Sequence, residues 1–245
     1  MIKLFSFVAS CAGEKSKTAA FSDTLSEAFR KRAEEEGMEV RYERMTGADV
    51  HIDYCRSCNS CFRTGICPLD TGDDMKKLKE KMLAADILFF GSPVYLWQMS
   101  GMAKSVLDRI GYWAHRYELL GKPCLTFTTT DSSHGSEVSQ EMAKLLRFMG
   151  TIVVDAGTKT AKGIETDPAD TAEKLMAVYK DPASGVSFLQ QNAHVSRVIM
   201  IRRYLKRIAG TGEEPIDEAR VFHERGLDKY VILEEAIREL IPKPD

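Results

Sequence analysis

The chain has 245 residues, of which 44% are hydrophobic, and its formal net charge is −2 at neutral pH. A chain of this length can bury a full hydrophobic core and does not need disulfide bonds or metal ions to stabilise it. Its balanced charge argues against nucleic acid or an acidic substrate as a partner. No apolar run reaches the length of a membrane span. Four of the six cysteines crowd together, which is not the pattern of a secreted disulfide framework, so we expect a reducing compartment and a cytoplasmic protein.

The first segment predicts a strand that leads into an anion-binding loop. Residues 2–9 are mostly apolar, but the largely apolar run from Leu4 to Val8 is too short for a secretion signal, whose apolar core needs about 7 to 15 residues. The loop that follows is rich in hydroxyls and opens a helix, whose free amides favour a phosphate. It lacks the sequence of a triphosphate loop and that of a dinucleotide site. The alternative is that Ser16 only caps the helix.

The helix after this loop carries Phe21, Leu25, Ala28 and Phe29 on one face and ends near Gly37, and residues 38–45 predict a second strand. Further helices are predicted at 73–83, 102–115 and 136–149, and further strands at 86–90, 123–128 and 151–155. Five strands that alternate with four helices indicate an α/β fold with a doubly wound parallel sheet. Such a sheet binds ligands at the carboxyl ends of its strands.

Four cysteines lie within thirteen residues after the second strand, at Cys55, Cys58, Cys61 and Cys67. The C-x2-C-x2-C-x5-C spacing differs from the bacterial ferredoxin run only in its last spacer, and Pro68 follows the fourth cysteine. A [4Fe–4S] cluster, a zinc ion and reduced thiols without a metal all remain open. The remaining cysteines, at positions 11 and 124, are not expected to be ligands.

Beyond residue 163 the alternation stops, which predicts a domain over 1–163 and a helical extension over 164–245. Helices are expected at 168–179, 186–208, around Ala219 and at 227–240. Residues 195–208 mix apolar and basic side chains. This stretch could lie on an anionic membrane, but we favour packing on a partner subunit because the charges do not leave one clean apolar face.

The run Gly-Ser-Pro-Val-Tyr-Leu-Trp at 91–97, with Lys104 and the pair Asp108 and Arg109, resembles the flavodoxin-like NAD(P)H-dependent FMN reductases. The cysteine loop after strand two is similar to that of the iron-sulfur flavoproteins. The resemblance implies a five-stranded sheet of order 2-1-3-4-5. We interpret Asp108 and Arg109 as structural rather than catalytic.

The resemblance also implies three groups of FMN-binding residues. Those of the phosphate loop are Ser10, Ser16, Lys17 and Thr18. Those around the isoalloxazine ring are Pro93, Val94, Tyr95, Leu96 and Trp97. Those of a third loop, which is usually glycine-rich, are Thr129, Thr130, Asp131 and Gly135. The threonines and Asp131 depart from the family pattern and leave the substrate open.

We therefore expect an FMN-dependent oxidoreductase, a homodimer or homotetramer, in which a cluster and the flavin exchange electrons. The partners would be small-molecule electron donors or acceptors, and a ferredoxin is a further candidate. The alternatives are a metal-free NAD(P)H-dependent reductase of flavins, quinones, nitro or azo compounds, and a zinc-stabilised binding module.

Overall fold

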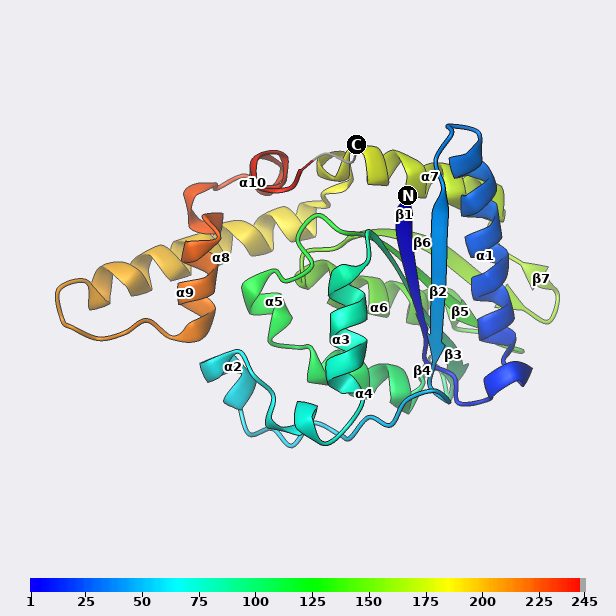
Figure 1. Ribbon diagram of the computed structural model, residues 1–245, viewed down its shortest axis with the longest axis horizontal. Helices are drawn as coiled ribbons and strands as arrows, with labels where there is room; N and C mark the ends of the chain where they lie inside the picture. Colours follow the sequence, from blue (N-terminus) through cyan, green and yellow to red (C-terminus); the bar gives the residue numbers. More distant parts are fainter. Residues whose placement is uncertain (243–245) are drawn as a thin grey trace.

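The computed structural model describes residues 1–242 and contains the expected parallel sheet (Figure 1). Five strands pair in parallel in the order β2-β1-β3-β5-β6, which confirms the predicted flavodoxin-like order. Their bounds are β1 Ile2–Val8, β2 Val40–Thr46, β3 Ile87–Tyr95, β5 Pro123–Thr129 and β6 Ile152–Thr160. Among the described residues, no helix is both long enough and apolar enough to cross a membrane.

Two short antiparallel strands correct the predicted strand ends. β4 (Gln98–Met99) pairs with Val94 and Tyr95, so β3 continues past the predicted end at residue 90. β7 (Gly163–Ile164) pairs with the end of β6, which runs to residue 160 rather than 155. The extension is therefore not purely helical at its start. A strand gains backbone hydrogen bonds from any neighbour that pairs with it, and hydrophobic periodicity alone does not reveal such a neighbour.

Helices cover both faces of the sheet. Those on one face are α1 (Lys17–Glu34) and α7 (Pro168–Lys180). Those on the other are α3 (Met75–Ala84), α4 (Gly101–Arg109), α5 (Trp113–Arg116) and α6 (Gly135–Phe148). Successive side chains of a strand point to opposite faces, so Leu4 joins the first core while Phe5 and Phe7 join the second. All three are nearly fully buried.

The prediction of one continuous helix over 102–115 was wrong, because the structure has two helices there, with a break between residues 109 and 113. α4 ends at Arg109, and the Trp113 amide then donates to the Ile110 carbonyl in a tight turn. Gly111 lies in this turn, where a glycine costs less than inside a helix. The predicted helix over 227–240 is likewise divided into a 3-10 turn, η4 (Leu227–Lys229), and α10 (Leu233–Leu240).

The carboxyl-terminal helices form a third core against the sheet domain. α8 (Phe188–Ile208), which projects beyond the sheet in Figure 1, and α9 (Asp217–Glu224) contribute Val198, Ile201 and Phe222. These side chains pack with Leu120 and Ile152. The division of the chain at residue 163 stays a prediction, although α7 lies beyond it and packs with α1 in the same core.

The cysteine loop contains a short helix, α2 (Ser60–Thr64), and a 3-10 turn, η2 (Pro68–Thr71). The remaining 3-10 turns of the described chain are η1 (Gly13–Lys15) and η3 (Pro182–Gly185). The loop lies beside α9, and Gly65 at the end of α2 lies against Arg116 and Asp217. The extension therefore contacts the segment that carries the cysteines.

Candidate functional site

A cavity of about 670 Å³ lies at the carboxyl ends of β1, β3, β5 and β6. This is where a doubly wound sheet is expected to bind its ligand. Ten of the predicted flavin-binding residues line it, and they are Ser10, Ser16, Lys17, Thr18, Pro93, Val94, Tyr95, Thr129, Thr130 and Asp131. Three loops far apart in the sequence thus meet at one cavity.

The start of α1 supplies the anion-binding end of the cavity. The Ser16 hydroxyl accepts a hydrogen bond from the Ala19 amide at 3.1 Å, which fixes the helix start. The amides of Lys17 and Thr18 lie in the first turn, where a helix has no carbonyl of its own to accept from them. They and the helix dipole favour an anion such as a phosphate.

Hydroxyl groups join the first and third loops. Thr18 and Thr129 are buried, and their hydroxyl oxygens lie 2.6 Å apart in a hydrogen bond. At the cavity mouth the Lys17 ammonium lies 2.9 Å from the Asp131 carboxylate, and about 70% of each side chain is exposed. An exposed pair of this kind contributes only about 0–1 kcal/mol, so Lys17 can exchange Asp131 for a bound anion at little cost.

The cysteine loop, residues 55–67, is called the cysteine segment below, and its four thiols differ in their exposure to solvent. Cys55 and Cys58 are exposed, Cys61 is half-buried and Cys67 is buried. Burial raises the pKa of the Cys61 thiol, and its electrostatic interactions with Cys67 and Cys55 raise it further. Within residues 1–242 no three His, Cys, Asp or Glu side chains are grouped closely enough to hold a metal ion. The segment thus places three sulfurs within electrostatic reach without closing a metal site.

The family model described as NADPH-dependent FMN reductase matches residues 2–166. The chain belongs to this family. This finding confirms the resemblance drawn from the 91–109 motif, and the matched region includes both the cavity and the cysteine segment.

Curated relatives are named iron-sulfur flavoproteins. The protein from Clostridioides difficile is 29% identical over 110 residues, which span 45% of this chain and 45% of its own. One from Archaeoglobus fulgidus is 33% identical over 96 residues, which span 39% of this chain and 42% of that one. This chain therefore covers less than half the length of either relative.

Solved structures support the fold of the family. An oxidoreductase from Corynebacterium diphtheriae superposes with a TM-score of 0.54 at 18% identity, over 72% of this chain and 96% of that one. An NADH:FMN oxidoreductase in its apo form gives a TM-score of 0.51 at 16% identity, over 76% and 91% of the two chains. At such low identity these likenesses are evidence of the fold alone.

The cavity is also lined by residues that the sequence analysis missed. They are Ala12, Lys15, Lys159, Thr160 and Ala161. The last three enter because β6 continues beyond residue 155, which places Lys159 beside Thr129. The register of neighbouring strands decides this placement, and the only sequence signals for a longer strand were the β-branched Thr158 and Thr160. Lys15 and Lys159 add positive charge to a cavity suited to an anion.

The remaining predicted residues, Leu96, Trp97 and Gly135, do not line this cavity. Leu96 and Trp97 form the turn of the β3–β4 hairpin with φ of 47° and 61°, a left-handed conformation that is unfavourable for such side chains. Trp97 stacks on His134, with ring centroids 4.3 Å apart. Gly135 serves packing instead, since an added Cβ would lie 2.1 Å from Thr158.

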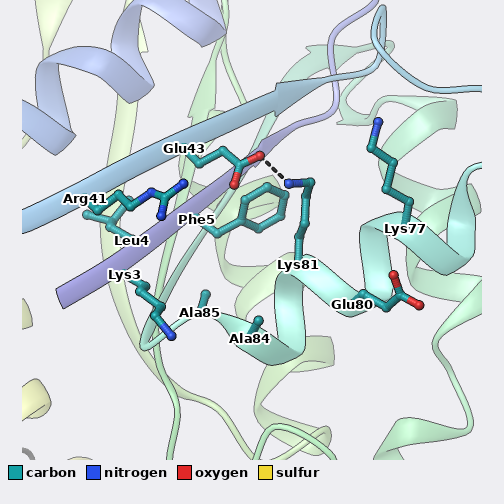
Figure 2. Close-up of a pocket in the computed structure, with 10 residues that line it drawn as sticks. All are labelled: Lys3, Leu4, Phe5, Arg41, Glu43, Lys77, Glu80, Lys81, Ala84 and Ala85. Atoms are coloured by element: carbon teal, nitrogen blue, oxygen red, sulfur yellow. Dashed lines mark hydrogen bonds and ion pairs between the residues drawn. The ribbon is translucent and has the colours of Figure 1, made fainter. Parts of the chain in front are cut away.

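A second hollow, of about 480 Å³, lies between α3 and the strands β1 and β2 (Figure 2). Figure 2 shows Lys81 reaching Glu43 across it, and Lys3, Arg41 and Lys77 also line it. None of the predicted site residues lies there. The first cavity, by contrast, combines a helix start with the meeting loops of the sheet, which is where such a sheet is expected to bind a ligand.

Proposed function

We propose that the protein is an FMN-dependent oxidoreductase whose FMN occupies the cavity at the carboxyl ends of the strands. The observation that carries this proposal is the convergence of the α1 start, the Pro93–Tyr95 backbone and the Thr129–Asp131 loop on one cavity. The phosphate would lie at the amides of Lys17 and Thr18. The flavin ring would lie along Pro93, Val94 and Tyr95.

The chain's own residues would bind and orient the cofactor rather than react. FMN, when bound, supplies the step between two-electron and one-electron partners. Buried Ser10 and Thr18 offer hydroxyls near the phosphate, while Thr129 and Thr130 offer polar groups at the third loop. Tyr95, which is largely exposed, would shield the ring from water.

We further propose that the four cysteines hold an iron–sulfur cluster. The donor set fits, because four thiolates are the ligands of a [4Fe–4S] cluster and all four lie within thirteen residues. The relatives named iron-sulfur flavoproteins support the same assignment. Small-molecule electron donors or acceptors, and a ferredoxin as a one-electron donor, would be the partners.

Anaerobic purification followed by absorption spectroscopy, with iron and sulfide analysis, tests both proposals. We expect flavin bands together with a broad shoulder that oxidation removes. Cys58→Ala should abolish the shoulder and leave the FMN affinity unchanged, with Thr24→Ala on the exposed side of α1 as the control. Loss of FMN from the Cys58 variant would contradict the separation of the two sites, and a wild-type protein without flavin would contradict the main proposal.

A metal-free NAD(P)H-dependent reductase is the second candidate. The observation that favours it is the match of residues 2–166 to the family described as NADPH-dependent FMN reductase. Anaerobic addition of NAD(P)H distinguishes the two, since direct bleaching of the flavin by a protein without iron would support this candidate. A colourless protein that contains zinc would instead indicate a binding module.

A further inference from the structure

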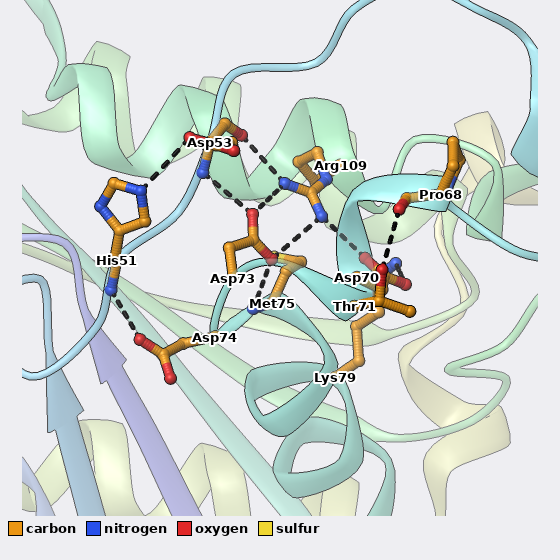
Figure 3. A network of polar contacts seen from close by, with 10 residues as sticks. All are labelled: His51, Asp53, Pro68, Asp70, Thr71, Asp73, Asp74, Met75, Lys79 and Arg109. Atoms are coloured by element: carbon orange, nitrogen blue, oxygen red, sulfur yellow. Dashed lines mark hydrogen bonds and ion pairs between the residues drawn. The ribbon is translucent and has the colours of Figure 1, made fainter.

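Arg109 is the last residue of α4, and its side chain is completely buried among carboxylates (Figure 3). Its Nη2 donates to the Asp70 carboxylate at 2.8 Å and to Asp73 at 3.2 Å. Its Nη1 donates to the other Asp73 oxygen and to the Asp53 carbonyl, the latter at 3.0 Å. A guanidinium has a rigid fork of donors, which suits it to hold several acceptors at once.

These acceptors lie on both sides of the cysteine segment. Asp53 comes two residues before Cys55, and Asp70 comes three residues after Cys67. Asp73 reinforces the closure, because its carboxylate also accepts the Asp53 amide at 2.9 Å. The Arg109 side chain, from a helix remote in the sequence, thus joins the residues just before the cysteine segment to those just after it (Figure 3).

The anchor is continuous with the buried cysteine. The Asp70 amide donates to the Cys67 carbonyl at 3.1 Å, and the Cys67 sulfur is close enough to act electrostatically on Arg109. Lys79 is buried as well and lies 2.7 Å from the second Asp70 oxygen. The Arg109 Nε–H has no hydrogen-bond acceptor among the described residues. Buried donors without an acceptor are rare in folded proteins.

We propose that Arg109 is a positioning residue, which holds the cysteine segment and its four thiols in place. It closes the segment that carries the four thiols and holds Cys67 in its buried place beside Cys61. This inference rests on the proposed function of the cysteines, since it assigns Arg109 a role toward the metal centre. In a metal-free protein the same closure would still protect Cys67 from solvent reagents.

The test measures the alkylation of each cysteine by N-ethylmaleimide in the metal-free protein, resolved by mass spectrometry. Arg109→Lys keeps one charge but loses the fork, so we expect Cys67 to react about tenfold faster through local opening of the segment. Exposed Cys55 and Cys58 should react at unchanged rates and serve as internal references. The matched control is Lys104→Gln on the exposed side of α4.

Asp70→Asn is the second variant, in case Arg109→Lys does not fold, and it should give a smaller increase at Cys67. The FMN affinity of each variant, measured by fluorescence titration, reports that the sheet domain is intact. Equal protection of Cys67 in the wild type and in a folded Arg109→Lys variant would overturn the inference.

Iron and sulfide content after anaerobic reconstitution separates this inference from the proposed cluster. If the wild type takes up a cluster, we expect Arg109→Lys to take up less, and equal uptake would overturn the positioning role. If the wild type binds no iron while Arg109→Lys still exposes Cys67, the cluster proposal fails and the positioning of the thiols stands.

Discussion

At the scale of single residues, Lys17 is the cation best placed to bind an anion at the α1 start, and its present partner is the exposed Asp131. We predict that Lys17→Met weakens FMN binding about 3- to 10-fold, because one exposed charge-assisted contact is lost. Asp131→Asn should leave the affinity equal or tighter, since it frees Lys17. Fluorescence titration of both variants tests this prediction, and weaker binding by Asp131→Asn would contradict it.

Leu96 combines a left-handed backbone with a side chain that is 98% exposed. Asn adopts this conformation more readily than Leu, and little packing is lost at such an exposed position. We predict that Leu96→Asn raises the free energy of unfolding by about 0.5–1 kcal/mol. Urea denaturation measures it, and Leu96→Ala is the control, for which no gain is expected. Equal effects of the two substitutions would show that the backbone is not strained here.

At the scale of elements, Gly65 ends α2 with φ of 73°, and an added Cβ would lie 2.4 Å from Arg116 Nη1 and 2.9 Å from Asp217 Oδ2. We predict that Gly65→Ala destabilises the protein by about 1–3 kcal/mol, as the backbone cost adds to the clash with the ion pair. Gly37→Ala is the matched control, because Gly37 has the same φ and no atom within 4 Å of the added Cβ. Urea unfolding should show the smaller loss for the control.

The closure of the cysteine segment should be sensitive to acid. Burial alone would raise the pKa of Asp73, but hydrogen bonds from Arg109 and from the Asp53 and Met75 amides outweigh it, so its pKa lies below the ordinary value. The stabilisation is therefore complete above the unfolded-state pKa of about 3.9 and is lost as the pH falls through the lower folded-state pKa.

We predict that Asp73→Asn lowers the free energy of unfolding at pH 7 and that this deficit shrinks below about pH 4, where the wild type loses the same interaction. Urea unfolding at a series of pH values from about 2.5 to about 7 measures this difference in the free energy of unfolding. Exposed Asp170→Asn on α7 is the control. A deficit that stays constant with pH would show that the carboxylate charge is not what matters.

Much of the element pattern could be predicted from the sequence, because buried parallel strands read as short apolar runs and helices as amphipathic stretches. The loop between β1 and α1 was also predictable, since a helix start after the first strand defines it locally. The ends of β3 and β6 were not, because they depend on β4 and β7 pairing across space. The same reason explains why Lys159 was missed and why Trp97 turned out to stack on His134.

At the scale of the whole molecule, the predicted site residues separate into two regions on one sheet. The cavity is formed by loops at the strand ends, whereas the cysteine segment is held between α4, α3 and α9. The sequence predicted both regions from local motifs. It could not predict that Arg109 would join the two ends of the cysteine segment, because Asp53 and Asp73 are remote from it along the chain.

The packing of α7 on α1 has a consequence for the order in which the protein is made on the ribosome. Ala172, Leu175 and Met176 complete the core that Phe21 and Leu25 begin, so this core stays incomplete until the chain has been synthesised to residue 176. A nascent polypeptide that stops at residue 166 lacks α7, so the apolar side chains that α7 covers remain exposed to solvent and prone to aggregation. We expect such a product to need chaperones, whereas one that extends past residue 185 completes this core.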